Sequence, residues 1–380
     1  METFGRYQLI RKLATGGMGQ IFLARQSGPV GFQKLLVVKR ILPHLSEEEE
    51  FIKMFFDEAR IAALLNHPNI AQLFDVGEVD GVFFIAMEYV HGESVRQLNA
   101  RANADKGGLP LGLKCRILAD AAAGLDYAHR AKSNSGRALG LIHRDVSPQN
   151  VLVGFNGCVK LIDFGIAKAT NKISHTVAGA IKGKYPYMSP EQARGEELDP
   201  RSDVFGLGIV LYELLTSSRL FKRETDHQTL KAVVGAKVVP PSALVSDVKK
   251  PLDAIVLKAL ARKREERFQT AGELQLALEE FVIQHRLPAT AGHLAAFMRE
   301  LYSQELEDER FANEPTQIHY DARYTQEQRA VQAAQAKPGE KQGEEKAKAS
   351  ERSVSADKPR VTERRVRNTG EVPKSGNRRR

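Results

Sequence analysis

Three polar side chains near the middle of the chain have types and spacing that could bind a metal ion and activate a hydroxyl group. Asp145 and Asn150 lie five positions apart in the segment HRDVSPQN, residues 143–150, and Asp163 follows two short apolar stretches later. Carboxylate and amide oxygens suit Mg²⁺, which typically takes one or two protein ligands and completes its shell with water and phosphate. We therefore expect Asn150 and Asp163 to bind Mg²⁺ and Asp145 to orient a substrate hydroxyl as a general base.

A predicted β-hairpin would bring the two metal-ligand candidates together. Apolar stretches at 151–153 and 159–162 flank Asn156-Gly157, a dipeptide that favours positive φ and a tight reversal. Antiparallel pairing would then place Asn150, just before the first strand, beside Asp163, just after the second. The alternative is that Asp163-Phe164-Gly165 is a strand-end turn and Asn150 a cap. This alternative would be the favoured explanation for either residue alone. It is disfavoured because both residues lie at the two ends of one hairpin.

The elements that must hold these residues follow from hydrophobic periodicity. Strands are expected at 7–13, 21–24, 35–39, 71–76 and 82–87, and helices at 47–65, 115–131, 202–216, 251–262, 271–285 and 292–302. The last helix is amphipathic and is expected to pack on the helical part of the chain, with docking to another chain as the less favoured alternative. The fold class is thus α+β, with a small strand-rich lobe, a larger helical lobe and a crevice between them.

Composition limits the class of protein. The chain has 380 residues, of which 42% are hydrophobic, and its longest apolar run, residues 204–212, is well short of the ~20 residues that span a bilayer. That run predicts a buried helix. The N-terminus lacks the apolar core of a secretory signal, so a cytoplasmic location is expected. Cys115 and Cys158 are too few for a disulfide framework and are expected to be reduced packing residues.

Positive charge is concentrated at the C-terminal end. Residues 321–380 carry 16 Lys or Arg against 9 Asp or Glu, which accounts for +7 of the formal net charge of +9. This segment has few aromatic residues and cannot bury enough apolar surface to offset its ordering entropy, so it is expected to be disordered. A solvated tail is favoured over nucleic-acid binding, and a contact with an anionic partner stays open.

Further motifs extend the pattern along the chain. A glycine-rich segment occupies residues 13–21, a lysine at 39 ends an apolar strand, and Glu58 lies on the following helix. Ser189-Pro190-Glu191 and the helix-start residue Asp203 follow the hairpin. In this order, residues from about 7 to 285 resemble a eukaryotic-type (Hanks-type) Ser/Thr protein kinase, most like the soluble bacterial members.

The resemblance implies a domain organisation and roles for individual residues. A kinase N-lobe would span 1–88, the hinge and C-lobe 89–286, a helical extension 287–312 and the disordered basic tail 313–380. Asp145 would be the catalytic base, Asn150 and Asp163 the Mg²⁺ ligands, and Lys39 the residue that pairs the ATP phosphates and is held by Glu58. Arg267 is the expected partner of Glu191, and Asp203 is expected to brace the catalytic loop.

The same resemblance implies an ATP site between the lobes. The phosphate-binding loop would comprise Leu13, Ala14, Thr15, Gly16, Gly17, Met18, Gly19, Gln20 and Ile21, and the backbone of Glu88 and Val90 would bind adenine, with Leu152 also lining the nucleotide site. Ala14 stands where the family usually has its first glycine, so the loop is expected to be somewhat stiffer. Taken alone, the glycine-rich segment is a weak signal.

Ser147 departs from the family pattern. Ser/Thr kinases typically carry a lysine two residues after the catalytic aspartate, where its charge helps to neutralise the transferring phosphoryl group. Here the lysine stands at Lys184, at a position where the family has a threonine that contacts that lysine. The hypothesis is that Lys184 restores the cation from the opposite side. The alternative is a solvated surface lysine and impaired catalysis.

Two functions follow from the resemblance. The first is an ATP- and Mg²⁺-dependent protein kinase that acts on Ser or Thr, since the Ala-Ala-Arg catalytic loop of tyrosine kinases is absent. Arg144 would pair with a phosphorylated activation segment, for which Thr176 and then Ser174 are the preferred autophosphorylation sites. The second is a weakly active pseudokinase scaffold that signals through its tail.

Overall fold

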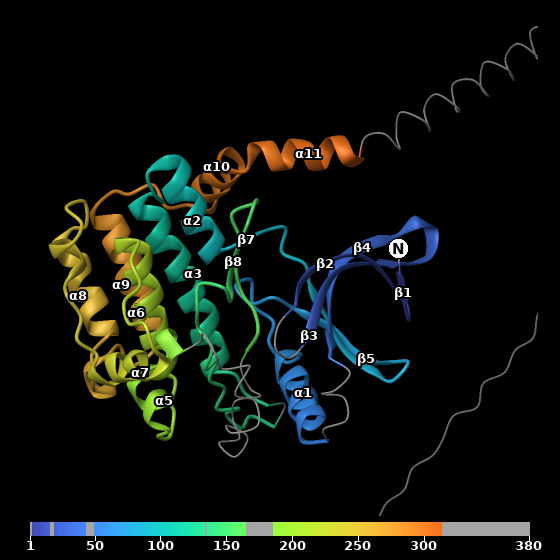
Figure 1. Cartoon of the computed structure of the whole chain (residues 1–380), viewed down its shortest axis with the longest axis horizontal. Coiled ribbons are helices and arrows are strands. Elements are labelled where there is room, and N and C mark those ends of the chain that lie inside the picture. The colour runs from blue at the N-terminus through green and yellow to red at the C-terminus, as the bar shows by residue number, and fades with distance from the viewer. Residues whose placement is uncertain (1, 16–18, 43–48, 134, 165–184, 314–380) are drawn as a thin grey trace, which may run out of the picture. The chain divides into compact units, whose positions relative to one another are not determined.

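The computed structural model describes residues 2–15, 19–42, 49–133, 135–164 and 185–313. Within these ranges the first part of the chain forms a β-sheet with one helix, and the rest is mainly helical (Figure 1). The predicted α+β fold, with a small β-rich lobe and a larger helical lobe, is confirmed. The tail that was expected to be disordered lies outside the described residues, and the residue limits expected for the individual domains stay predictions.

The small lobe contains an antiparallel sheet in which the described strands follow the order β1-β2-β3-β4-β6-β5. They are β1 (Glu2–Phe4), β2 (Tyr7–Thr15), β3 (Gly19–Ser27), β4 (Gln33–Ile41), β5 (Leu73–Val79) and β6 (Val82–Glu88). The alternation of apolar residues along β4 buries Leu36 and Val38 against Tyr7 and Phe84. On helix α1 (Glu49–Ala62), Phe55 and Ala59 pack in a second cluster with residues of β4 and β6.

The large lobe combines a small sheet with helices. Its described elements are β7 (Gly92–Ser94), α2 (Val95–Lys106), α3 (Leu111–His129), β8 (Val151–Gly154), β9 (Val159–Leu161), α5 (Pro190–Arg194), α6 (Arg201–Thr216), α7 (Asp226–Gly235), α8 (Lys250–Ala259), α9 (Ala271–Gln284), α10 (Ala291–Leu301) and α11 (Ser303–Asn313). Strands β7, β8 and β9 pair antiparallel in that order. One hydrophobic core, to which α3, α6, α9 and α10 all contribute, holds this lobe together.

Helix α6 lies at the centre of that core. Every residue from Ser202 to Leu215 is buried, so the helix shows no polar face, as the apolar run in its sequence predicted. A helix surrounded by protein on all sides positions its first turn firmly, and Asp203 lies in that turn. No helix within the described ranges combines the length and hydrophobicity that crossing a bilayer requires.

Several elements were not predicted because their hydrophobic periodicity is weak. Helix α2 buries only Val95, Leu98 and Ala102, and its limits are set by caps instead. The Ser94 side chain accepts a hydrogen bond from the backbone N–H of Gln97, and Gly107 ends the helix at φ 70°, in the left-handed region that glycine tolerates. Strands β1 and β7 are three residues each, too short to show alternation.

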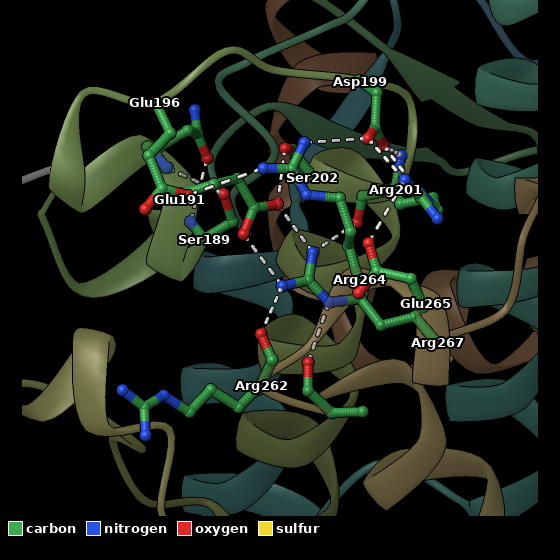
Figure 2. Close-up of polar contacts among 12 residues, drawn as sticks. Ser189, Glu191, Glu196, Asp199, Arg201, Ser202, Arg262, Arg264, Glu265 and Arg267 are labelled. Atoms are coloured by element: carbon green, nitrogen blue, oxygen red, sulfur yellow. Dashed lines mark hydrogen bonds and ion pairs between the residues drawn. The ribbon is translucent and has the colours of Figure 1, made fainter.

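A buried ion pair joins α5 to the segment between α8 and α9 (Figure 2). The Arg267 guanidinium donates to both carboxylate oxygens of Glu191, at 2.7 and 2.8 Å, which confirms the predicted pair. Its other N–H groups donate to the carbonyl oxygens of Ala261, Arg201 and Arg262, so all five donors are satisfied. Such complete pairing is what makes a buried charge pair tolerable in a core.

Replacing Arg267 by methionine tests this anchor. The substitution keeps the apolar volume but leaves the buried Glu191 carboxylate without its cation, so the free energy of unfolding is expected to fall by about 3–5 kcal/mol. Urea unfolding of the full chain at neutral pH measures the change. Lys263→Met is the matched control, since the Lys263 side chain is 73% exposed and its ion pair with Glu266 lies at the surface. Equal stability of the two variants would contradict the assigned role.

The same pair predicts an acid-dependent loss of stability. Burial by itself would raise the pKa of Glu191, but hydrogen bonds and charge from Arg267 outweigh it and lower the pKa from 4.5 to about 2. Because the folded carboxyl binds its proton only at lower pH, the stabilisation is present above pH 4.5 and is lost as pH falls towards 2. Unfolding free energies measured between pH 6 and pH 3 should therefore decline less steeply in Glu191→Gln than in the unaltered chain. Identical slopes would show that Glu191 does not supply this dependence.

Candidate active site

The segment HRDVSPQN folds into a loop that is closed by Asn150. The Asn150 side-chain amide donates to the Asp145 carbonyl oxygen at 2.8 Å and to the Asp145 carboxylate oxygen Oδ2 at 3.0 Å. The backbone N–H of Asn150 also donates to the carbonyl of Ser147 at 3.0 Å. The structure therefore brings Asp145 and Asn150 into direct contact, as their spacing suggested.

The predicted hairpin is confirmed and sets the position of Asp163. Strands β8 and β9 pair with Val151 opposite Leu161, and the Ile162 N–H donates to the Asn150 carbonyl at 3.0 Å. Asn150 and Asp163 therefore lie side by side where the hairpin opens. The reversal at the far end places Gly157 at φ 81°, which explains why glycine is needed there.

Lys39 reaches this hairpin from the small lobe. Its Nζ atom lies 2.9 Å from Asp163 Oδ1, an ion pair that links β4 to the end of β9. Lys39 is opposite Ile21 of β3 and Ile85 of β6, so the sheet fixes its backbone on both sides. Glu58 lies on α1, but the placement of its side chain is outside what the structure describes, and its pairing with Lys39 stays a prediction.

The buried carboxylate of Asp203 holds the start of the loop 143–150, the expected catalytic loop. Its two oxygens accept the backbone N–H groups of His143, at 2.7 Å, and Arg144, at 2.9 Å. The ring of His129, at the end of α3, lies 2.8 Å from Asp203 Oδ2. Burial would raise the pKa of Asp203, but the hydrogen bond and charge of His129 outweigh it and lower the pKa, so the carboxylate is ionised. The predicted brace is confirmed.

That brace stabilises an unfavourable backbone conformation. Arg144 has φ 62° and Asp163 has φ 54°, both in the left-handed region that non-glycine residues rarely adopt. Such a residue costs about 1–3 kcal/mol and persists only when its surroundings fix it. For Arg144, the hydrogen bond to Asp203 supplies part of that constraint.

His143 is a structural residue of the site that the sequence reasoning did not single out. Its ring is buried, which lowers its pKa and keeps it neutral. Nδ1 accepts the Asp145 N–H at 3.3 Å, so Nε2 carries the proton and donates to the Ile162 carbonyl at 3.2 Å. The ring also packs on Phe164, with centroids 4.5 Å apart. His143 thus connects the loop of Asp145 to the strand end of Asp163, and its place in the His-Arg-Asp triplet was the available signal.

Ser147 lies within the loop in an unusual state. The residue is 3% exposed, and its hydroxyl oxygen has no hydrogen-bond partner among the described residues. Leaving a buried hydroxyl unpaired costs about 1–3 kcal/mol, so such a group marks a place where another polar group is expected. Lys184, its hypothesised counterpart, lies outside the described residues.

The predicted phosphate-binding loop is described only in part. Leu13, Ala14 and Thr15 end β2, and Gly19, Gln20 and Ile21 begin β3, whereas Gly16, Gly17 and Met18 lie outside the described residues. At Gly19, an added Cβ would lie 2.2 Å from the carbonyl oxygen of Arg40. Gly19 is thus required by the close approach of β4, a packing reason that the motif alone did not reveal.

The predicted hinge connects β6 to β7. The Glu88 N–H donates to the Gln72 carbonyl at 2.8 Å, which leaves the Glu88 carbonyl as the backbone group that it could offer to adenine. Its carboxylate lies 2.8 Å from Lys160 Nζ, on β9. Val90 is buried within the segment that joins the lobes, between β6 and β7. Leu152 of β8 is opposite Ser94 of β7, which follows that segment.

The residues at the hairpin end fit a magnesium ion. The Asn150 amide nitrogen donates within the loop, so its amide oxygen would be one ligand, and the Asp163 carboxylate, which also pairs with Lys39, would be the second. Within the described ranges no group of three or more His, Cys, Asp or Glu could hold a metal by itself. An ion bound here would therefore need water and phosphate to complete its shell, as Mg²⁺ typically does in nucleotide sites.

The structure describes Arg144 but not the two residues expected to be phosphorylated. The side chain of Arg144 is half-buried, and burial lowers its pKa. Its carbonyl accepts a hydrogen bond from the Gln192 side chain at 3.0 Å, which links the catalytic loop to α5. Thr176 and Ser174, the expected autophosphorylation sites, lie outside the described residues.

Comparisons with known proteins agree with this geometry. Residues 7–277 match the family model described as "Protein kinase domain". A relative from Myxococcus xanthus, named tyrosine-protein kinase MasK, is 44% identical over 310 residues, covering 82% of this chain and 48% of the relative. Serine/threonine-protein kinase PknB of Mycobacterium leprae is 38% identical over 278 residues, covering 72% of this chain and 42% of the relative. The chain thus spans about half the length of these curated relatives.

A solved structure leads to the same family. The kinase domain of PknI from Mycobacterium tuberculosis superposes with a TM-score of 0.55 at 30% sequence identity, covering 73% of this chain and 97% of that one. The matched region contains the loop of Asp145 and Asn150, the hairpin that ends at Asp163, and the strand that carries Lys39. On these grounds the chain belongs to the protein kinase family.

Proposed function

We propose that the chain is an ATP- and Mg²⁺-dependent protein kinase that phosphorylates Ser or Thr hydroxyls, its own activation segment among them. The observation that carries the proposal is the convergence of four side chains from both lobes. Asn150 contacts Asp145 at 3.0 Å, Lys39 contacts Asp163 at 2.9 Å, and the hairpin places Asn150 beside Asp163. A carboxylate, an amide, a second carboxylate and an ammonium in this arrangement suit phosphoryl transfer.

Each residue has a defined part in the proposed reaction. Asp145 accepts the proton of the acceptor hydroxyl as its oxygen bonds to the γ-phosphorus, while the bond from that phosphorus to the bridging oxygen breaks and ADP leaves. Lys39 binds the phosphates by charge. Asn150 and Asp163 would hold Mg²⁺, which when bound neutralises phosphate charge and fixes the orientation of ATP. The active site acts chiefly by positioning and electrostatics, which is the usual basis of this reaction.

The nature of the acceptor is part of the proposal. The loop reads Asp145-Val146-Ser147-Pro148-Gln149-Asn150 and lacks the Ala-Ala-Arg sequence of tyrosine kinases, which favours Ser and Thr. The PknB relatives are named serine/threonine kinases, whereas the Myxococcus xanthus relative is named a tyrosine kinase. Tyrosine is therefore the second acceptor to be tested. The cytoplasmic location expected from the sequence belongs to the same proposal.

A pseudokinase scaffold is the competing function. Ala14 in the glycine-rich segment and Ser147 in the catalytic loop depart from the family pattern, and both would weaken catalysis. Against this, a scaffold has no need for Asp145 and Asn150 to be held together or for Lys39 to be directed at Asp163. The geometry of these contacts favours an active enzyme.

Incubation of the full chain with radiolabelled ATP, Mg²⁺ and a generic protein acceptor tests the proposal. We expect incorporation of label that depends on Mg²⁺ and falls by at least about 100-fold in Asp145→Asn, because the general base is lost. Phosphoamino-acid analysis should yield phosphoserine and phosphothreonine, and peptide mapping should place label on Thr176 or Ser174.

Asp80→Asn is the matched control for this experiment. Asp80 is an exposed turn residue with φ 51°, a conformation that asparagine tolerates, so the same chemical change should leave incorporation unchanged. Label on tyrosine alone would reject the Ser/Thr assignment. If the unaltered chain incorporates no label, the scaffold becomes the better account.

Exchange of Ser147 and Lys184 tests whether the missing cation is supplied from the opposite side. Lys184→Thr should lower the rate of phosphoryl transfer by about 10- to 100-fold, because one charged group that stabilises the transition state is removed. Ser147→Lys alone adds a second cation and should also lower the rate of phosphoryl transfer. The double exchange is expected to recover to within about threefold of the unaltered rate. A double variant no faster than either single variant would reject the compensation.

A further inference from the structure

The helices that follow the family-matched region are an integral part of the large lobe. Leu294 and Met298 of α10 are fully buried in the main hydrophobic core, and Leu301 and Tyr302 are nearly so. The turn of the β8–β9 hairpin touches the start of α10 so closely that a Cβ on Gly157 would lie 2.0 Å from the Ala291 carbonyl oxygen. Helix α10 is thus fixed in place, and it determines where α11 begins.

Acidic residues spaced along α10 and α11 contact basic residues of α2 and the hinge in reverse order. Glu300 lies 2.6 Å from Lys106, at the end of α2, and Glu305 lies 3.2 Å from Arg101, one turn and a half earlier. The third contact joins Glu309 to His91, at 2.8 Å, just before β7. The contacts therefore follow α2 backwards along the chain to the hinge. In Figure 1, α10 lies beside α2 and α11 continues from α10.

At the hinge, the contact partner of Glu309 is already held by aromatic rings. The His91 ring stacks on Tyr89, with centroids 6.0 Å apart, and meets the edge of Phe155 at 4.9 Å. Phe155 in turn packs on Tyr302, at 5.5 Å. Burial, followed by the nearby Glu305 carboxylate, raises the pKa of Glu93 on β7, which is a further sign that α11 lies against this segment.

We propose that α11 is a strap that positions the hinge, and that Glu309 acts on nucleotide binding through His91. The chain between Glu88 and β7 is short, and by the proposed function, on which this inference rests, the backbone of Glu88 and Val90 binds adenine. A group that holds His91 limits the movement of those backbone atoms. Glu309 is then a positioning residue that touches neither nucleotide nor acceptor.

The expected size of the effect follows from the exposure of the contact. The side chains of His91 and Glu309 are 48% and 50% exposed, so a single contact of this kind contributes modestly. We expect Glu309→Gln to weaken ADP binding and raise the KM for ATP by about two- to fivefold, with kcat unchanged.

Glu307→Gln is the matched control, because Glu307 is an exposed residue of the same helix and loses the same charge. A charge exchange, His91→Glu with Glu309→Lys, should restore ADP affinity to within about twofold, whereas either single change should not. A merely structural role for Glu309 would lower stability without this recovery. Isothermal titration with ADP and Mg²⁺, on the full chain, measures the affinities.

Hydrogen exchange of the hinge amides, residues 88–94, provides a readout that needs no nucleotide. We expect exchange to be about two- to fivefold faster in Glu309→Gln than in Glu307→Gln. Equal exchange rates in the two variants, or an ADP affinity that is unaffected by Glu309→Gln, would overturn the strap. Failure of the unaltered chain to bind nucleotide would instead reject the proposed function, while the exchange rates would still decide whether α11 holds the hinge.

Discussion

The site depends first on one buried carboxylate. Asp203 lies in the first turn of a helix that is surrounded by protein, and it accepts hydrogen bonds from the backbone of His143 and Arg144. Because Arg144 adopts a left-handed conformation, the loop could not keep its shape without such a constraint. The packing of α6 in the core thus determines the position of Asp145, because Asp203 of α6 holds the backbone of the loop.

A second constraint holds the loop of Asp145 from the side of α5. Arg267, whose guanidinium N–H groups are all hydrogen-bonded, holds Glu191 on α5. The neighbouring Gln192 side chain donates to the carbonyl of Arg144. The catalytic loop is therefore tied to two separate parts of the large lobe, α6 and α5. Lys39, by contrast, arrives from the small lobe, so the alignment of the four site residues depends on how the two lobes are joined.

Sequence reasoning predicted those parts of the fold and site that short-range patterns determine. The Asn156-Gly157 reversal fixed the register that brings Asn150 to Asp163, and the apolar run of α6 indicated its burial. The strap contacts were missed, because surface acidic residues such as Glu305 have no distinctive spacing and their partners are some 200 positions away in the chain. The structural role of His143 depends on a ring orientation that its neighbours impose, which no local pattern encodes.

The contact between Gly157 and Ala291 has a consequence for the order in which the protein can mature. The hairpin that carries Asn150 and ends at Asp163 is synthesised well before α10, yet its turn rests directly on that helix. Until α10 has been synthesised, the core residues that Leu294 and Met298 cover in the folded protein are exposed to water. Final consolidation of the hairpin that joins Asn150 to Asp163 thus waits for a segment that lies outside the family-matched region.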